Sequence, residues 1–145
     1  MRYLITGVAG FIGFHLAKKL SKKNLVFGID NLNNYYSKKI KIERLKILKR
    51  KKSFKFSKIN ISNLNKLKKF LKDKKFDAII HLAAQPGVQY SLKNRKSYFD
   101  NNIKAQFNLL ETIAKFNVTK KFIYGSSSSV YGEKSNKKET FNIEK

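Results

Sequence analysis

Three glycines near the start of the chain separate a short apolar segment from an amphipathic helical pattern. Gly7, Gly10 and Gly13 follow an expected buried strand over residues 2–6, in the spacing G-x-x-G-x-x-G. The first N–H groups of a helix have no intrahelical acceptors and favour an anion, and glycine lets the backbone come close to it. This turn therefore predicts a pyrophosphate site, although the same glycines would also serve tight packing of a helix against a strand.

A carboxylate at the end of the next apolar segment makes this prediction more specific. Residues 25–29 indicate a second strand, and Asp30 follows it 17 residues after Gly13. A carboxylate in this position accepts hydrogen bonds from both hydroxyls of an adenosine ribose and repels a 2′-phosphate. The combination predicts binding of NAD rather than NADP, with purely structural glycines and a surface aspartate as the weaker alternative.

Segments with strand and helix patterns alternate from one end of the chain to the other. Such alternation predicts an α/β fold with a doubly wound parallel sheet and helices on both faces, in a single domain over residues 1–145. The pattern fades after Gly132, so we expect the sheet to be incomplete at its C-terminal end. Expected strands are 2–6, 25–29, 53–61, 76–81 and 121–124, expected helices include 11–23, 38–52 and 97–116, and 82–91 is an expected loop.

Apolar spacing within the helical segments predicts which side chains face the sheet. Ser62 is the expected N-cap of a further helix. The expected inward residues are Ile12, Leu16 and Leu20 in the first helix, Ile42, Leu45 and Leu48 in the second, Leu64, Leu67, Phe70 and Leu71 in the third, and Ile103, Phe107, Leu110 and Ala114 in the last.

The chain is strongly basic, with a formal charge of +24, and this would ordinarily suggest a nucleic-acid partner. Almost all of the excess is lysine, whereas proteins that read phosphates and bases favour the planar fork of arginine. The densest basic run, residues 38–52, carries apolar residues at helical spacing and is the expected solvated face of an amphipathic helix. We therefore expect no nucleic-acid partner and attribute the charge to a compositional bias toward lysine codons.

Other residue types limit the remaining function classes. The sequence has no cysteine, which excludes thiolate metal sites and favours a reducing, cytoplasmic setting. Apolar runs are too short for a membrane span, and glycines interrupt the one segment that resembles a signal peptide. His15 and His81 lack a second ligand at suitable spacing, so we expect structural roles for both and no metal.

Taken in order, the motifs resemble those of the extended short-chain dehydrogenases/reductases, in the NAD-dependent epimerase/dehydratase family. The similarity is strongest to the nucleotide-sugar epimerases that act on UDP-glucuronate. It implies a Rossmann-type fold, an NAD cofactor, a UDP-sugar substrate and inversion of sugar C4 in polysaccharide precursor synthesis. Alternatives are another UDP-sugar epimerase or dehydratase, or a non-catalytic dinucleotide-binding module. The resembling segments are residues 7–20, 28–36, 81–85, 87–88, 90–92 and 122–132.

The resemblance also implies cofactor contacts, residue by residue. Asn60 departs from the family pattern, which usually has an acid there, so the amide keeps an acceptor and loses the charge. Asn101 would steady the segment between the cofactor and the catalytic strand. The implied contacts are Gly7, Gly10, Phe11, Ile12 and Gly13 at the pyrophosphate, Asp30 and Asn31 at the adenosine ribose, Asn33 near the phosphates, Asn60 and Ile61 at adenine, and Leu82, Ala83 and Ala84 beside the nicotinamide ribose.

For the sugar, the resemblance implies that Ser127 hydrogen-bonds the 4-hydroxyl, with Ser126 and Ser128 in support. Serines at this place, where related dehydratases have Thr-Asp-Glu, favour epimerisation. Two positions depart from the pattern of the glucuronate enzymes: Pro86 replaces a small residue and Gln89 replaces an arginine. The implied substrate contacts are Gln85, Val88, Tyr90 and Ser91.

The implied base of this reaction is a tyrosine in a Tyr-x-x-x-Lys motif, which accepts the hydroxyl proton while hydride leaves C4. No such pair follows the serine strand within the chain; Tyr131 has Ser135 four residues later. The family's pair is expected some twenty residues beyond Tyr131, past Lys145. We therefore expect an N-terminal fragment that is inactive alone, from an enzyme that dimerises through helices equivalent to residues 97–116 and a later one.

Overall fold

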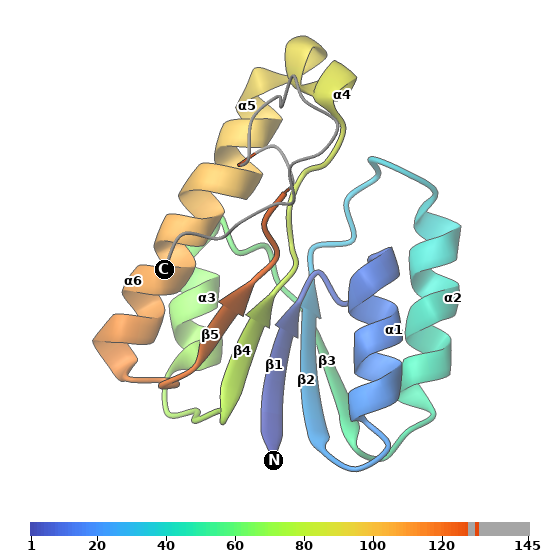
Figure 1. Ribbon diagram of the computed structural model, residues 1–145, viewed down its shortest axis with the longest axis vertical. Helices are drawn as coiled ribbons and strands as arrows, with labels where there is room; N and C mark the ends of the chain where they lie inside the picture. The colour runs from blue at the N-terminus through green and yellow to red at the C-terminus, as the bar shows by residue number, and fades with distance from the viewer. Residues whose placement is uncertain (128–129, 131–145) are drawn as a thin grey trace, which may run out of the picture.

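The computed structural model describes residues 1–127 and 130, and its centre is a five-stranded sheet (Figure 1). All neighbouring strands pair in parallel, in the order β3-β2-β1-β4-β5. The expected α/β fold is confirmed. The strands are β1 (Arg2–Thr6), β2 (Leu25–Asp30), β3 (Phe54–Lys58), β4 (Ala78–His81) and β5 (Phe122–Tyr124).

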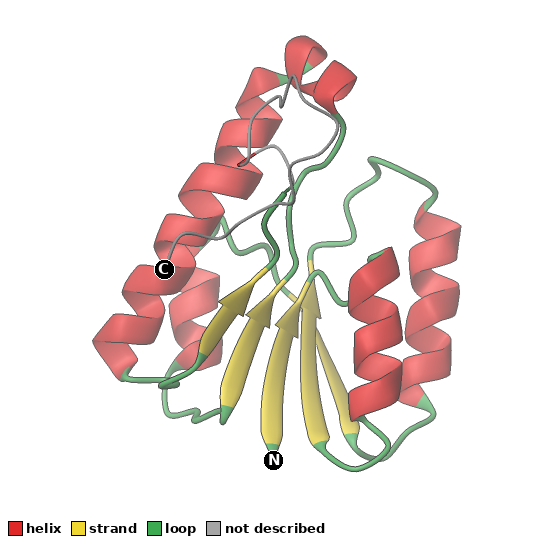
Figure 2. Ribbon diagram, viewed as in Figure 1, coloured by secondary structure: helices red, strands yellow, loops and turns green. Residues whose placement is uncertain are grey.

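Helices cover both faces of this sheet, with α1 and α2 on one face and α3 and α6 on the other (Figure 2). A short π-helical segment, η1, continues directly into α6. The helices are α1 (Phe11–Leu20), α2 (Lys38–Lys49), α3 (Leu64–Leu71), α4 (Val88–Lys93), α5 (Arg95–Tyr98), η1 (Phe99–Lys104) and α6 (Ala105–Phe116).

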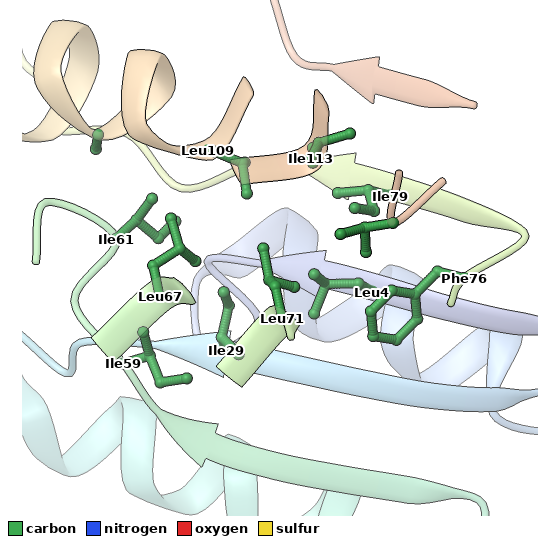
Figure 3. Packing of buried hydrophobic residues seen from close by; sticks show 12 residues of the cluster. Leu4, Ile29, Ile59, Ile61, Leu67, Leu71, Phe76, Ile79, Leu109 and Ile113 are labelled. Atoms are coloured by element: carbon green, nitrogen blue, oxygen red, sulfur yellow. The ribbon is translucent and has the colours of Figure 1, made fainter. Parts of the chain in front are cut away.

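Each face of the sheet packs its own apolar core. Leu4 of β1 belongs to the core beneath α3 and α6, whereas its neighbour Ile5 belongs to the core beneath α1 and α2. Successive residues of a strand point to opposite faces, so a sheet covered on both sides needs consecutive apolar residues. Figure 3 shows the first core, in which Leu67 and Leu71 of α3 meet Leu109 of α6 over the sheet.

The strand order places a crevice at the carboxyl ends of β1 and β4. The chain leaves β1 for α1 on one face, and leaves β4 toward α4, α5 and α6 on the other. Ligands of open parallel sheets bind at such a reversal, because the two connections diverge and leave an opening. The glycine turn after β1 lies at this point.

Several expected boundaries are wrong. β3 ends at Lys58 rather than near residue 61, and residues 88–93 form α4 although 82–91 read as a loop. The N-cap of α3 is Asn63, whose side-chain oxygen accepts the Lys66 N–H at 3.0 Å. The Ser62 hydroxyl instead donates to the Asp100 carbonyl, 2.5 Å away, and so ties the start of α3 to η1.

The expected inward face of the last helix is also wrong. Ile103, Phe107, Leu110 and Ala114 are all exposed, and Phe107 is 63% accessible. The buried face carries two polar side chains among its apolar residues. Asn108 donates to the carbonyls of Ile61 and Ser62, and the Thr112 hydroxyl donates to the Asn108 carbonyl. Hydrogen bonds thus offset the cost of burying them. The buried residues of α6 are Ala105, Asn108, Leu109, Thr112 and Ile113.

In the first two helices, some of the residues expected to face the sheet are exposed, and other residues are buried instead. Ile12 and Ile42 are exposed, whereas Phe14 and Ala17 of α1 and Lys41 of α2 are buried. Among the described residues, no helix is both long and apolar enough to cross a membrane.

Candidate functional site

A cleft of about 1020 Å³ opens at the carboxyl ends of the central strands. Its volume is at the upper end of the range found for ligand pockets. The structure brings every expected cofactor contact to its wall. Those lining residues are Gly7, Gly10, Phe11, Ile12, Gly13, Asp30, Asn31, Asn33, Asn60, Ile61, Leu82, Ala83, Ala84 and Asn101.

The glycine turn is packed against the segment that follows β4. Gly7 has a φ of +68°, a conformation that side chains disfavour, and a Cβ there would lie 2.8 Å from the Ala83 Cα. At Gly13 a Cβ would collide with the Gly7 carbonyl oxygen. Gly10 caps α1 without a side-chain hydrogen bond, so the N-terminus of the helix meets the cleft as bare backbone. Such a terminus binds an anion through its N–H groups and dipole.

Asp30 is buried at the end of β2 and is held by backbone on both sides. One carboxylate oxygen accepts the Ala9 N–H at 3.0 Å, and the other accepts the Leu32 N–H at 2.8 Å. Each carboxylate oxygen can accept a second hydrogen bond. The carboxylate therefore keeps acceptor capacity for two hydroxyls while its position is fixed by the glycine turn.

The carbonyl of Ala9 is held by two side chains that the sequence patterns do not predict. Arg44 of α2 donates to the Ala9 carbonyl at 3.2 Å and to the Tyr36 hydroxyl at 3.1 Å, and Tyr36 donates to the same carbonyl at 3.3 Å. Burial raises the pKa of Tyr36, opposed by the Arg44 charge. Arg44 is one of only four arginines in a lysine-rich chain. This rarity is the sequence signal that could have identified Arg44 as a residue of the site.

Lys41 also lines the cleft, and it corrects the expectation of a fully solvated basic run. The side chain is buried, and its ammonium donates to the carbonyl and the side-chain oxygen of Asn33, at 3.0 and 2.6 Å. The ammonium lies 4.5 Å from the centre of the Tyr36 ring. Burial lowers the pKa of Lys41, partly offset by the nearby Asp30 carboxylate.

Thr6 fixes the backbone wall opposite the glycine turn. Its hydroxyl oxygen accepts the N–H groups of Leu82 and Ala83, at 3.2 and 3.1 Å, and lies 2.6 Å from Nδ1 of His81. With both acceptor positions occupied, the hydroxyl donates its proton to Nδ1, which leaves the imidazole neutral with a proton on Nε2. Burial lowers the pKa of His81 to about 4, in agreement with this structural role.

The other histidine, His15, is exposed on α1 and contacts two aromatic rings. His15 makes edge contacts with the rings of Phe11 and Phe14, with ring centres 4.9 and 5.0 Å apart. Both rings belong to α1, the helix that carries His15 itself.

The segment after β4 is joined to η1 by an amide pair. The Gln85 N–H donates to the Asn102 side-chain oxygen at 2.7 Å, and the Asn102 amide donates to the Gln85 carbonyl at 3.1 Å. Asn101, expected to steady the segment between the cofactor and the catalytic strand, donates to the Ser97 carbonyl at 2.7 Å and lines the cleft. The hydrogen bonds from η1 to the segment after β4 come from Asn102.

The expected sugar contacts are only partly brought together. Gln85 and Val88 line the cleft, whereas Tyr90 lines a neighbouring polar hollow of about 560 Å³. Ser91 lines neither, and its hydroxyl donates to the Val88 carbonyl at 2.5 Å. Tyr90 meets the Tyr35 ring edge-on at a centre-to-centre distance of 4.9 Å, which connects α4 to the segment after β2.

The serine strand end faces the same cleft. Ser126 and Ser127 line it directly after β5, and the Gly125 N–H donates to the His81 carbonyl at 3.1 Å. Ser128 lies outside the described residues. The described part of the serine cluster therefore shares one cavity with the glycine turn and Asp30.

Known proteins resemble the chain over nearly its whole length. The family model for GDP-mannose 4,6 dehydratase matches residues 4–144. Protein CapI of Staphylococcus aureus is 46% identical over 94% of this chain and 41% of its own length. UDP-glucuronate 4-epimerase of Thermodesulfobacterium geofontis is 45% identical over 92% of this chain and 41% of its own length.

A solved structure agrees in fold. UDP-glucuronic acid 4-epimerase from Bacillus cereus, in complex with UDP-glucuronic acid and NAD, superposes with a TM-score of 0.84 at 41% identity, over 94% of this chain and 43% of that one. The chain thus spans about two fifths of the length of these relatives. By this match and by the site described above, the chain belongs to the NAD-dependent epimerase/dehydratase family represented by GDP-mannose 4,6 dehydratase.

Proposed function

We propose that this chain is the NAD-binding part of a UDP-sugar 4-epimerase that inverts C4 of UDP-glucuronate through a transient 4-keto sugar. One observation carries the proposal: the glycine turn, Asp30 and the serines after β5 line a single cleft. The relatives named for this activity support it, since the match to them covers over nine tenths of the chain.

The cleft residues fit NAD. The N-terminus of α1 offers helix N–H groups to a pyrophosphate, and Asp30 has acceptor capacity for both ribose hydroxyls. Asn31 and Asn33 would complete the ribose and phosphate contacts, and Ile61 would flank adenine with Asn60 at its edge. When bound, NAD supplies the acceptor and donor of the hydride.

The serines would hold the sugar at the other end of the cleft. Ser127 would hydrogen-bond the 4-hydroxyl, with Ser126 and Ser128 in support, while Gln85, Val88, Tyr90 and Ser91 would contact the substrate. The proton of this hydroxyl would pass to a tyrosine whose pKa is lowered by a lysine four residues later. We assign that pair to a segment that follows residue 145 in the longer family chains, together with most of the sugar site.

A homodimer of the longer enzyme also belongs to this proposal. Phe99, Ile103, Phe107 and Leu110 form an exposed apolar stripe along η1 and α6. An apolar stripe of this kind on a surface helix favours burial against a partner. The cytoplasmic location, the role in polysaccharide precursor synthesis and the absence of nucleic-acid and membrane partners stay predictions.

A chimaera tests the proposed activity directly. Residues 1–132 would replace the matching part of the Bacillus cereus epimerase, and NMR would follow conversion of UDP-glucuronate to its C4 epimer. We expect turnover that is lost on Ser127→Ala. A folded chimaera that binds NAD without turnover would contradict the proposal and favour a non-catalytic module, whereas loss of water from the sugar would identify a dehydratase.

A further inference from the structure

One ammonium in this basic chain is buried. Lys41 is 5% exposed, and no other lysine among the described residues is buried. It projects from α2 toward the segment after β2, where both of its acceptors belong to Asn33. Both acceptors are uncharged amide oxygens, so neither hydrogen bond pairs the ammonium with an anion.

The surroundings of this ammonium leave its charge without an ion pair. The ion pairs among the described residues join Lys46 to Glu43 and Lys96 to Asp100. The charged or titratable groups facing Lys41 are Asp30 at the end of β2, Tyr36 after β2 and Arg44 on α2 itself. Removing a cation from water without a paired anion is costly, and an anionic ligand in the same cavity would offset that cost.

The hydrogen bonds of the Lys41 ammonium also favour an anionic ligand. An ammonium has three N–H donors, and Asn33 accepts two of them, so one donor remains for a ligand. Arg44, the neighbouring cation, is engaged with the Ala9 carbonyl and Tyr36. Lys41 lines the same cleft as Gly10, where the pyrophosphate is expected, and Asp30, where the adenosine ribose is expected.

We propose that Lys41 is a cofactor-binding residue that donates to the phosphate oxygens of the dinucleotide, with Asn33 holding its ammonium in place. This inference rests on the proposed NAD site. It assigns to one lysine of the basic run a ligand role distinct from that of its exposed neighbours.

Two ligands separate a phosphate contact from a structural role. ADP-ribose carries the pyrophosphate, whereas adenosine has the same base and ribose without it. NMR titrations of the full chain would compare the wild type with Lys41→Met, using the exposed Lys38→Met on the same helix as the control. We expect Lys41→Met to weaken ADP-ribose binding by roughly tenfold to a hundredfold. The affinity for adenosine should change less than about twofold. A larger loss of affinity for ADP-ribose than for adenosine would show that Lys41 contacts a phosphate.

A pH series provides a second readout. Because burial lowers the pKa of Lys41, the affinity of the wild type for ADP-ribose should fall as the pH rises through that lowered value. Lys41→Arg keeps its charge at every accessible pH, so it should retain binding and lose this alkaline decline. The same series with Lys38→Met should follow the wild type.

The outcomes distinguish this inference from the function on which it rests. Equal weakening of ADP-ribose and adenosine would show that Lys41 only supports the fold of the cleft. Unchanged ADP-ribose affinity in a folded Lys41→Met chain would also overturn the phosphate contact, leaving the NAD site intact. A wild-type chain that binds neither NAD nor ADP-ribose would instead overturn the proposed function.

Discussion

The Thr6 hydroxyl lies 2.6 Å from Nδ1 of His81 and joins the carboxyl ends of β1 and β4. The same oxygen accepts the backbone N–H groups of Leu82 and Ala83, which form the wall of the cleft facing Gly7. One buried hydroxyl at the end of β1 therefore fixes the backbone wall that faces the glycine turn.

Replacing this hydroxyl by a methyl group should be costly. Thr6→Val keeps the volume and leaves two backbone N–H groups and Nδ1 of His81 without their partner. We expect a loss of about 1–3 kcal/mol in the free energy of unfolding, measured by urea denaturation. Thr6→Ser keeps the hydroxyl and should recover most of this loss; equal destabilisation by the two variants would refute the role of the hydroxyl.

Acidification should destabilise the fold through His81. The unfolded chain takes up a proton on this imidazole near its ordinary pKa of 6.5, whereas the folded chain does so only near 4. Between these values the unfolded state binds more protons, so the stability contributed by neutral His81 is lost as the pH falls from about 6.5 to 4. The full effect is about 3 kcal/mol.

The control for this effect removes the titrating group. His81→Phe fills the space without an ionisable ring, so its stability should decline less steeply between pH 6.5 and 4. Urea denaturation of both chains across this range gives the comparison. Parallel pH profiles would mean that another group causes the acid sensitivity.

Adding a methyl group to the glycine turn should damage the site. At Gly7 the positive φ disfavours a side chain, and the Cβ would press on the Ala83 backbone. We expect Gly7→Ala to cost about 1–3 kcal/mol in stability and to abolish NAD binding. Gly125→Ala is the matched control for Gly7→Ala, because its Cβ would meet the flexible Leu82 side chain at 3.3 Å and not tightly packed backbone atoms. A Gly7→Ala chain with wild-type stability and affinity would contradict the packing described.

Two neighbouring apolar residues of α6 should respond differently to truncation. Leu109 is fully buried, so Leu109→Ala should lower stability by about 2–5 kcal/mol. Phe107 is exposed, so Phe107→Ala should change the stability of the single chain by less than about 0.5 kcal/mol. Thermal and urea unfolding at low protein concentration measure both.

The same Phe107 residue tests the proposed dimer. In the longer enzyme, Phe107→Glu should shift sedimentation toward the monomer, because a charge would enter the apolar stripe. A dimer that withstands this change would place its interface elsewhere.

Local sequence patterns are sufficient to predict those parts of the structure whose residues are close together in the sequence. The strands over residues 2–6 and 25–29 are predicted by short apolar runs, and the glycine spacing with Asp30 predicts the place of the cleft, because a strand, a tight turn and a helix follow each other directly. The limits of β3 and the short helix α4 do not follow from the sequence, since neither has a strong periodic pattern over enough residues.

Predictions failed where distant partners decide the outcome. Asn108 and Thr112 occupy the buried face of α6 because the carbonyls of residues 61 and 62 accept the Asn108 amide, and no local pattern encodes that contact. The basic run predicts a solvated Lys41, although its ammonium is buried and donates to Asn33. Both are polar residues whose burial depends on tertiary hydrogen bonds, which apolar periodicity cannot register.

The central claim is that the glycine turn and Asp30 form an NAD site, and calorimetric titration of the chain with NAD and NADP tests it most directly. We expect NAD to bind and NADP to bind at least about tenfold more weakly, because its 2′-phosphate would meet the Asp30 carboxylate. Asp30→Asn should reduce the difference between the affinities for NAD and NADP. Equal binding of the two cofactors, or no binding of NAD by the folded chain, would contradict the account.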